Sequence, residues 1–184
     1  MITLPTWITF SRLLGLPFVL YFLDTPNNND RIWALSIFLL AASTDWLDGY
    51  LARKLDQVSD LGKFLDPLVD KLLVLGPLLA LIELGQIPAW GVFLILGREL
   101  AIAGWRVNPV HSSISGANIW GKLKTTSQIA AIALLIAPLP PVWKTPSLIA
   151  FWLSVALTLV SGAIYLLPQS AAKISSSVEK SISA

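Results

Sequence analysis

Residues 45–70 read DWLDGYLARKLDQVSDLGKFLDPLVD, in which the pattern DxxDGxxAR is followed, after eight residues, by GxxxDxxxD. The pattern contains two pairs of aspartates, Asp45 with Asp48 and Asp66 with Asp70, spaced by three and by four residues. On a helix either spacing puts both members of a pair on one face, so two helices can direct four carboxylates to a common centre. Carboxylate oxygens are the ligands that hard divalent cations prefer. The stretch therefore predicts a cation site between two helices.

The chain as a whole is strongly apolar. Of its 184 residues, 55% are hydrophobic and 13% are charged, and its mean hydropathy is +0.71, whereas soluble domains are about 45–50% apolar and about 25% charged. This composition indicates a membrane protein, in which carboxylates at membrane depth are costly and mark functional sites. The absence of cysteine excludes disulfides, zinc–thiolate sites and thiol nucleophiles. The net charge of +2 is too small to indicate a nucleic-acid partner, so none is expected.

Polar and proline-containing breaks divide the chain into six apolar segments of spanning length. We expect an all-α membrane protein with six transmembrane helices in one bundle, at residues 7–23, 32–55, 61–84, 89–107, 119–137 and 147–167. This bundle forms one catalytic domain over residues 1–168. Residues 169–184 are rich in Ser and Lys, and we expect them to form a polar cytoplasmic tail, either a short interfacial helix or a disordered segment.

The basic residues determine the expected orientation in the membrane. Six spans bring both termini to one side, and of the 13 Lys and Arg residues only Arg31 and Lys144 fall on the other side. Because basic residues gather in cytoplasmic loops, both termini and the aspartate pattern are expected to face the cytoplasm. We therefore expect an integral protein of a bacterial-type plasma membrane, or of an equivalent organelle membrane.

The residues around the aspartates favour chemistry on a phosphorylated nucleotide. Two divalent cations about 4 Å apart suit transfer at phosphorus, because they stabilise both the attacking and the leaving oxygen. Gly49, Ala52 and Gly62 keep the neighbouring helix surface small, so a bulky nucleotide can approach. Arg53 is placed to bind a diphosphate through two hydrogen bonds. Small residues in membrane helices also serve close helix packing, and for each glycine that alternative is equally good.

Ion transporters and proton pumps also contain intramembrane carboxylates, so a transporter without enzymatic activity is the alternative from another class. All four aspartates lie near one interface, and the outer halves of the six segments carry no acidic or basic residue apart from Glu83. A conduction path needs polar groups across the whole membrane. The distribution therefore favours a reaction centre at the interface.

At every fixed position the pattern matches the signature of the CDP-alcohol phosphatidyltransferase family, which the chain resembles over nearly its whole length. Members of that family are six-helix membrane enzymes with this motif on the second and third helices, at the cytoplasmic side. The resemblance implies that Asp45, Asp48 and Asp66 bind two divalent cations, Mg²⁺ or Mn²⁺. It implies that Asp70 acts as general base and also contacts a metal. The residues that would line the CDP pocket are Gly49, Ala52, Arg53 and Gly62.

The implied reaction is attack by an alcohol hydroxyl on the lipid-side phosphorus of CDP-diacylglycerol, with CMP leaving and Asp70 taking the hydroxyl proton. The N-terminal segment LPTWITFSRL resembles the PNxLTxxR segment common in these synthases: Thr9 and Arg12 match, and Thr6 stands where Asn is usual. The match adds Thr9 to the CDP-binding residues. For Arg12, an equally good alternative is a side chain that extends to the inner membrane interface.

A second cluster of charges, at the cytoplasmic ends of the fourth and fifth segments, suits an anionic acceptor. Its members are Arg98, Glu99, Arg106, Lys122 and Lys124. The sequences GRE at 97–99 and GKLKTTSQ at 121–128 resemble the corresponding regions of bacterial phosphatidylglycerolphosphate synthases, whose acceptor is glycerol 3-phosphate. The expected ligands of the acceptor phosphate are Arg98, Arg106, Lys122 and Lys124. The alternative is that these residues contact anionic lipid headgroups.

We therefore expect a metal-dependent transferase of phospholipid biosynthesis. It would transfer a phosphatidyl group from CDP-diacylglycerol to glycerol 3-phosphate, giving phosphatidylglycerol phosphate and CMP. The alternatives are a CDP-diacylglycerol-dependent cardiolipin synthase, another headgroup phosphatidyltransferase, or the ion transporter. The expected partners are the two substrates and the lipid bilayer, and the resemblance also implies a homodimer.

Overall fold

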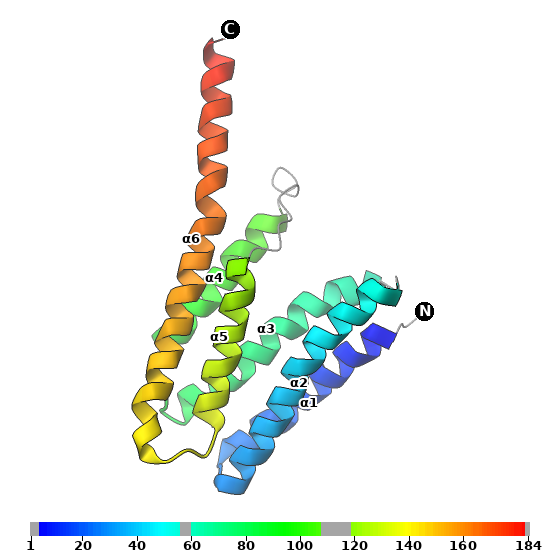
Figure 1. Cartoon of the computed structure of the whole chain (residues 1–184), viewed down its shortest axis with the longest axis vertical. Helices are drawn as coiled ribbons and strands as arrows, with labels where there is room; N and C mark the ends of the chain where they lie inside the picture. Colours follow the sequence, from blue (N-terminus) through cyan, green and yellow to red (C-terminus); the bar gives the residue numbers. More distant parts are fainter. Residues whose placement is uncertain (1–3, 56–59, 108–118, 183–184) are drawn as a thin grey trace.

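In the computed structural model, the backbone is described for residues 4–55, 60–107 and 119–182. Side chains are described for residues 9–44, 67–104 and 123–164, together with Leu65 and Gly121. The described backbone forms six α-helices and one short 3₁₀ helix (Figure 1). They are α1 (Leu4–Asp24), α2 (Asn28–Leu55), α3 (Asp60–Glu83), α4 (Ala89–Val107), α5 (Ile119–Ile136), η2 (Pro141–Trp143) and α6 (Lys144–Ile182). Each of the six expected segments corresponds to one helix, which confirms the all-helical expectation.

Turn chemistry accounts for two of the helix boundaries. Asn27 precedes α2, and its Oδ1 accepts hydrogen bonds from the backbone N–H groups of Asn29, at 2.8 Å, and Asp30, at 3.0 Å. Oδ2 of Asp30 in turn accepts a hydrogen bond from the backbone N–H of Asn27, so the helix start is capped reciprocally. At the end of α3, Gly85 has a positive φ of 65°, and its N–H donates to the carbonyl of Ile82. This is the left-handed conformation in which glycine ends a helix without a steric penalty.

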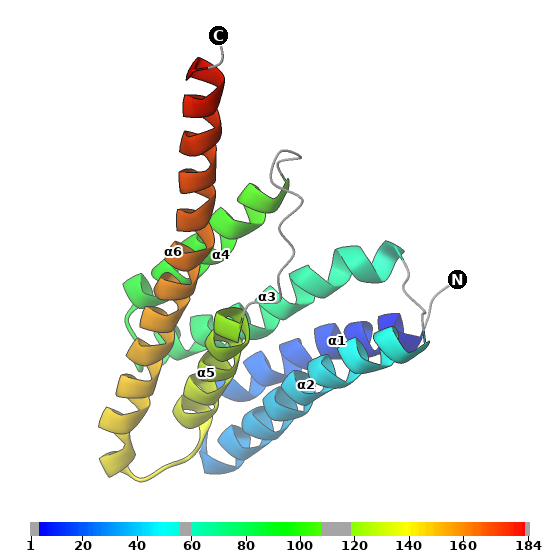
Figure 2. The same cartoon turned by 45° about the horizontal axis from the view of Figure 1, so that its top comes forward.

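The helices pack in two groups that meet in the lower part of the view and diverge toward its top (Figures 1 and 2). In both views α1 and α2 lie side by side, and α3 packs mainly on α1, whereas α6 lies against α4 and α5. Helix α5 also contacts α2 and α3, and α3 contacts α4. The two groups therefore meet along α3 and α5.

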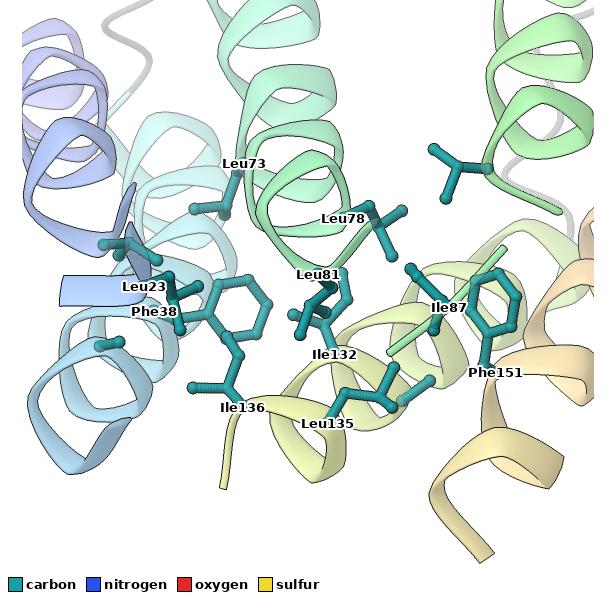
Figure 3. Packing of buried hydrophobic residues seen from close by; sticks show 14 of the residues in the cluster. Leu23, Phe38, Leu73, Leu78, Leu81, Ile87, Ile132, Leu135, Ile136 and Phe151 are labelled. Carbon is teal, nitrogen blue, oxygen red and sulfur yellow. The ribbon is translucent and has the colours of Figure 1, made fainter. Parts of the chain in front are cut away.

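A hydrophobic core fills the junction between the groups (Figure 3). Leu23 of α1, Phe38 of α2, Leu81 of α3, Ile132 of α5 and Phe151 of α6 are each at most 1% exposed. Such close packing supplies dispersion contacts that hold helices together even where no water is excluded. The core thus fixes how the helices that carry the candidate site are placed relative to one another.

One helical segment in the part of the chain with described side chains, Pro141–Ile164, is long and apolar enough to cross a membrane by length and composition. The apolar segment Leu123–Ile136 of α5 is shorter. Each of the six helices also exposes large apolar side chains, for example Phe18 on α1, Phe93 on α4 and Leu153 on α6. Extensive apolar surface of this kind is typical of a face that contacts lipid or a partner.

Helix α6 continues without a break to Ile182, through the segment expected to be a separate tail. Residues 183–184 lie outside the described backbone, and no side chain beyond Ile164 is described. The backbone is therefore helical over most of the expected tail. The division into a domain at residues 1–168 and a tail at residues 169–184 stays a prediction.

Candidate functional site

Both aspartate pairs lie within continuous helices. Asp45 and Asp48 are in α2, and Asp66 and Asp70 are in α3, so each spacing falls on one helix face as the sequence predicts. Of the four, only Asp70 lies among the described side chains. Within the described side chains, no group of three or more His, Cys, Asp or Glu residues is placed to hold a metal ion. The convergence of the four carboxylates therefore stays a prediction.

Several other expected site residues also lie in helices whose side chains are not described at those positions. They are Gly49, Ala52 and Arg53 in α2, Gly62 in α3, Arg106 in α4 and Lys122 in α5. Their positions on the backbone are known, but their contacts lie outside the described residues.

Asp70 is held by an arginine from the first helix. The side chain of Asp70 is 49% exposed, and its Oδ1 accepts a hydrogen bond from Nη1 of Arg12 at 3.1 Å. The Arg12 side chain is only 1% exposed, so it points into the protein and the alternative of a side chain extending to the interface is wrong. Thr9, one helical turn earlier, is also 1% exposed. This hydrogen bond thus connects Arg12 on α1 with the last aspartate of the motif, 58 residues later in the chain.

A cavity of about 300 Å³ connects Asp70 with the second charged cluster. Its walls come from α2, α3, α4 and α5, and its volume is at the lower end of the range for small-molecule sites. The charged and amide side chains that line it are Asp70, Lys71, Arg98, Glu99, Lys124 and Gln128. The structure therefore brings Arg98 and Lys124, two of the expected acceptor ligands, to the same cavity as the expected general base.

The side chains of Arg98 and Lys124 both bind one carboxylate oxygen of Glu99. Nη1 of Arg98 donates to Oε1 of Glu99 at 3.1 Å, and Nζ of Lys124 donates to the same oxygen. All three side chains are largely buried, with 13%, 18% and 11% exposed for Arg98, Glu99 and Lys124. Among the residues that line the cavity, the three positive charges of Lys71, Arg98 and Lys124 face the two negative charges of Asp70 and Glu99. The balance of charge among these residues is therefore positive and favours an anion.

Polar side chains of α6 stand behind this cluster, and the sequence reasoning missed them. Nη2 of Arg98 donates to Oγ of Ser161 at 3.0 Å, and Nε2 of Gln128 donates to Oγ1 of Thr158 at 2.9 Å. Ser154, Thr158 and Ser161 are all buried. They are spaced i, i+4, i+7 within an apolar segment, a pattern that puts them on one helix face and could have indicated buried polar partners.

Comparison with known proteins gives relatives over most of the chain. The model of the family described as CDP-alcohol phosphatidyltransferase matches residues 2–160. The chain is 39% identical over 183 residues to the CDP-diacylglycerol--glycerol-3-phosphate 3-phosphatidyltransferase of Bacillus subtilis (strain 168), covering 90% of this chain and 94% of that protein. It is 35% identical over 173 residues to the protein of the same name from Pseudomonas fluorescens, covering 89% and 84%. It is 33% identical over 161 residues to the probable phosphatidylglycerophosphate synthase of Mycobacterium tuberculosis (strain ATCC 25618 / H37Rv), covering 86% and 77%.

Proposed function

The chain belongs to the CDP-alcohol phosphatidyltransferase family, and from this premise we propose that it transfers a phosphatidyl group from CDP-diacylglycerol to glycerol 3-phosphate. The products are phosphatidylglycerol phosphate and CMP. The observation that carries the choice of acceptor is the single cavity lined by Asp70, Arg98 and Lys124. A general base and two cations in one cavity suit an acceptor with a hydroxyl to be deprotonated and a phosphate to be bound. The names of the relatives agree with this choice.

We propose that the six helices span a membrane, with the cavity and both termini at the cytoplasmic side. The apolar segment Pro141–Ile164 and the outward-facing apolar side chains support this placement. The basic residues also separate along the bundle. Lys124 lies in the first turns of α5, whereas Arg31 donates to the carbonyls of Leu135 and Ile136 at the opposite end of that helix, at 3.2 and 3.4 Å. A homodimer stays a prediction from the family resemblance.

The four motif aspartates would hold two divalent cations, Mg²⁺ or Mn²⁺. The donor set fits, because it consists of hard carboxylate oxygens at helical spacing, and Asp70 presents its half-exposed carboxylate to the cavity. When bound, the cations would neutralise the charge on the phosphate oxygens of CDP-diacylglycerol. The proposed ligands are Asp45, Asp48, Asp66 and Asp70.

The CDP moiety is proposed to bind beside the motif, where glycines and alanine leave room for the nucleotide and Arg53 reaches the diphosphate. The proposed residues are Thr9, Gly49, Ala52, Arg53 and Gly62. Thr9 is the one among them with a described side chain, and it is buried near Arg12 on α1.

The acid–base step follows from the position of Asp70. The acceptor hydroxyl oxygen forms a bond to the lipid-side phosphorus, the bond from that phosphorus to the CMP oxygen breaks, and CMP leaves with the electron pair. The hydroxyl proton passes to the carboxylate of Asp70. Arg12 contributes by holding this carboxylate in one orientation and by stabilising its negative charge.

The phosphate of the acceptor is proposed to bind Arg98 and Lys124, with Arg106 and Lys122 from the same two helices. In the described structure Glu99 accepts hydrogen bonds from both Arg98 and Lys124. Glu99 thus keeps the two buried cations together and offsets part of their charge until a phosphate binds.

A panel of acceptors tests the proposed function. Purified protein with CDP-diacylglycerol and Mg²⁺ is expected to release CMP when glycerol 3-phosphate is added, and to stop when the metal is chelated. CMP release with phosphatidylglycerol alone would identify the cardiolipin synthase alternative and refute the acceptor assignment. If no alcohol supports CMP release, the result would favour the alternative of an ion transporter without enzymatic activity.

Replacing Lys124 by alanine is expected to raise the KM for glycerol 3-phosphate by about tenfold or more, because a charged hydrogen bond to phosphate is worth about 1.5–3 kcal/mol. The KM for CDP-diacylglycerol is expected to change much less. Lys144→Ala is the matched control, since Lys144 is exposed and lines a different cavity. Equal effects of Lys124→Ala on both KM values would contradict the acceptor site.

A further inference from the structure

Arg98 belongs to α4, but its guanidinium is held by α6. Nη2 donates to Oγ of Ser161 at 3.0 Å across 63 residues of sequence, and Nη1 donates to Glu99 on its own helix. Ser161 is 6% exposed and Gly162 is also buried. The hydrogen bond to Ser161 is therefore made away from bulk water, where its geometry is well defined.

Gly162 shapes the path of the same side chain. A Cβ atom at this position would lie 3.0 Å from Cγ of Arg98 and 3.2 Å from its Nε. Nε is itself buried and has no hydrogen-bond acceptor within the described part of the chain. The guanidinium is thus oriented by the bonds of Nη1 and Nη2. Its stem packs so closely on Gly162 that an alanine there would require the stem to shift by a few tenths of an ångström.

We propose that Ser161 and Gly162 of α6 are positioning residues for the acceptor site, which set the affinity for the acceptor phosphate by fixing Arg98 without touching the substrate. The inference rests on the proposed function, in which Arg98 binds that phosphate. An arginine side chain has many rotamers, and a planar guanidinium binds phosphate well only in one orientation. Holding it in place before the acceptor arrives removes that ordering from the binding step.

The Ser161→Ala variant tests the hydrogen bond. Its KM for glycerol 3-phosphate is expected to rise about three- to tenfold, as for loss of one hydrogen bond, while the KM for CDP-diacylglycerol and the kcat at saturating acceptor stay within about twofold. Gly162→Ala displaces the stem without removing a polar group, and the same split is expected. If one of the two variants fails to fold, the other still tests the positioning role.

Two controls separate positioning from general damage. Ser154→Ala makes the same substitution in the same helix, at a buried serine that donates to the carbonyl of Phe151 and not to Arg98. Gly76→Ala introduces a tighter contact elsewhere, because a Cβ there would lie 2.8 Å from Cδ1 of Leu16. Both controls are expected to leave the ratio of the two KM values unchanged, even if they lower the melting temperature.

The double variant Arg98→Ala, Ser161→Ala decides whether the effect passes through Arg98. Arg98→Ala alone is expected to raise the acceptor KM, and adding Ser161→Ala is expected to raise it no further. An equal effect of Ser161→Ala with and without Arg98, or no effect in the wild-type background, would overturn the positioning role and leave the acceptor site intact. If Arg98→Ala had no effect on the acceptor KM, the acceptor-site assignment of Arg98 would itself be wrong.

Discussion

The Asp70→Asn variant is expected to lose CMP release by about 10²- to 10⁴-fold, because an amide cannot take the proton from the acceptor hydroxyl. The fold is expected to survive, since the amide oxygen can still accept the hydrogen bond that Arg12 donates at 3.1 Å. Initial rates of CMP release at saturating substrates measure the first effect. Circular dichroism and the melting temperature measure the second.

Two comparisons make the Asp70 result specific. Asp24→Asn changes an exposed carboxylate at the end of α1, and its activity is expected to match that of the wild type. A titration with Mg²⁺ separates the two proposed roles of Asp70, because excess metal can restore occupancy of a weakened cation site but cannot restore a missing base. Residual activity near the wild-type rate at high Mg²⁺ would mean that Asp70 is a metal ligand only.

Most helix ends could be predicted closely because they carry strong local signals, and the end of α6, which runs on to Ile182, is the exception. Asn27 caps α2 through its own side chain, and Gly85 ends α3 with a positive φ. Both effects depend on a few neighbouring residues and on no distant contact. The apolar segments between such signals are long enough that a shift of two or three residues at an end does not change the assignment.

The meeting of Asp70 with Arg98 and Lys124 could also be predicted in outline. In an alternating series of helices, the start of α3, the end of α4 and the start of α5 lie at the same end of the bundle. Lys124 lies toward that end, whereas Asp70 and Arg98 lie near the middle of α3 and α4. Sequence order therefore predicted that these residues approach one another, but placed Arg98 closer to the helix end than it is. Sequence order could not predict which side chains form hydrogen bonds with one another, such as Lys124 with Glu99.

The rotation of each helix about its own axis, which decides the face that packs against the protein, could not be predicted from the sequence. Helix α1 is apolar on most of its surface, so its sequence does not reveal which side faces the protein, and two directions for Arg12 remained equally good. Packing fixes the choice: Gly76 of α3 receives Leu16 of α1 at close range. Arg12, four residues before Leu16, then faces inward on the same side of the helix. Ser161 was missed for a similar reason, since its spacing with Ser154 and Thr158 indicates a buried polar face on α6 but does not indicate that Arg98 is the partner.

Arg12→Ala is expected to lower kcat by about 10- to 100-fold, the second largest effect after that of Asp70→Asn. The carboxylate of Asp70 keeps its chemistry but loses the group that orients it, and misplacement of a catalytic group by about 1 Å can cost about 100-fold in rate. The KM for glycerol 3-phosphate is expected to change much less, because Arg12 is not among the residues that line the cavity. Steady-state kinetics with each substrate in turn measure this split.

The control for Arg12 is Arg31→Ala, because Arg31 is also an arginine with a structural contact, here with the last carbonyls of α5. Its loss removes these hydrogen bonds at the end of α5 and is expected to lower the melting temperature but not kcat. Arg12→Lys keeps a positive charge on a shorter side chain, and its kcat is expected to lie between those of Arg12→Ala and the wild type. If Arg12→Ala lowered only the melting temperature, as is expected of Arg31→Ala, the contact at 3.1 Å would serve stability alone and Asp70 would need no orienting partner.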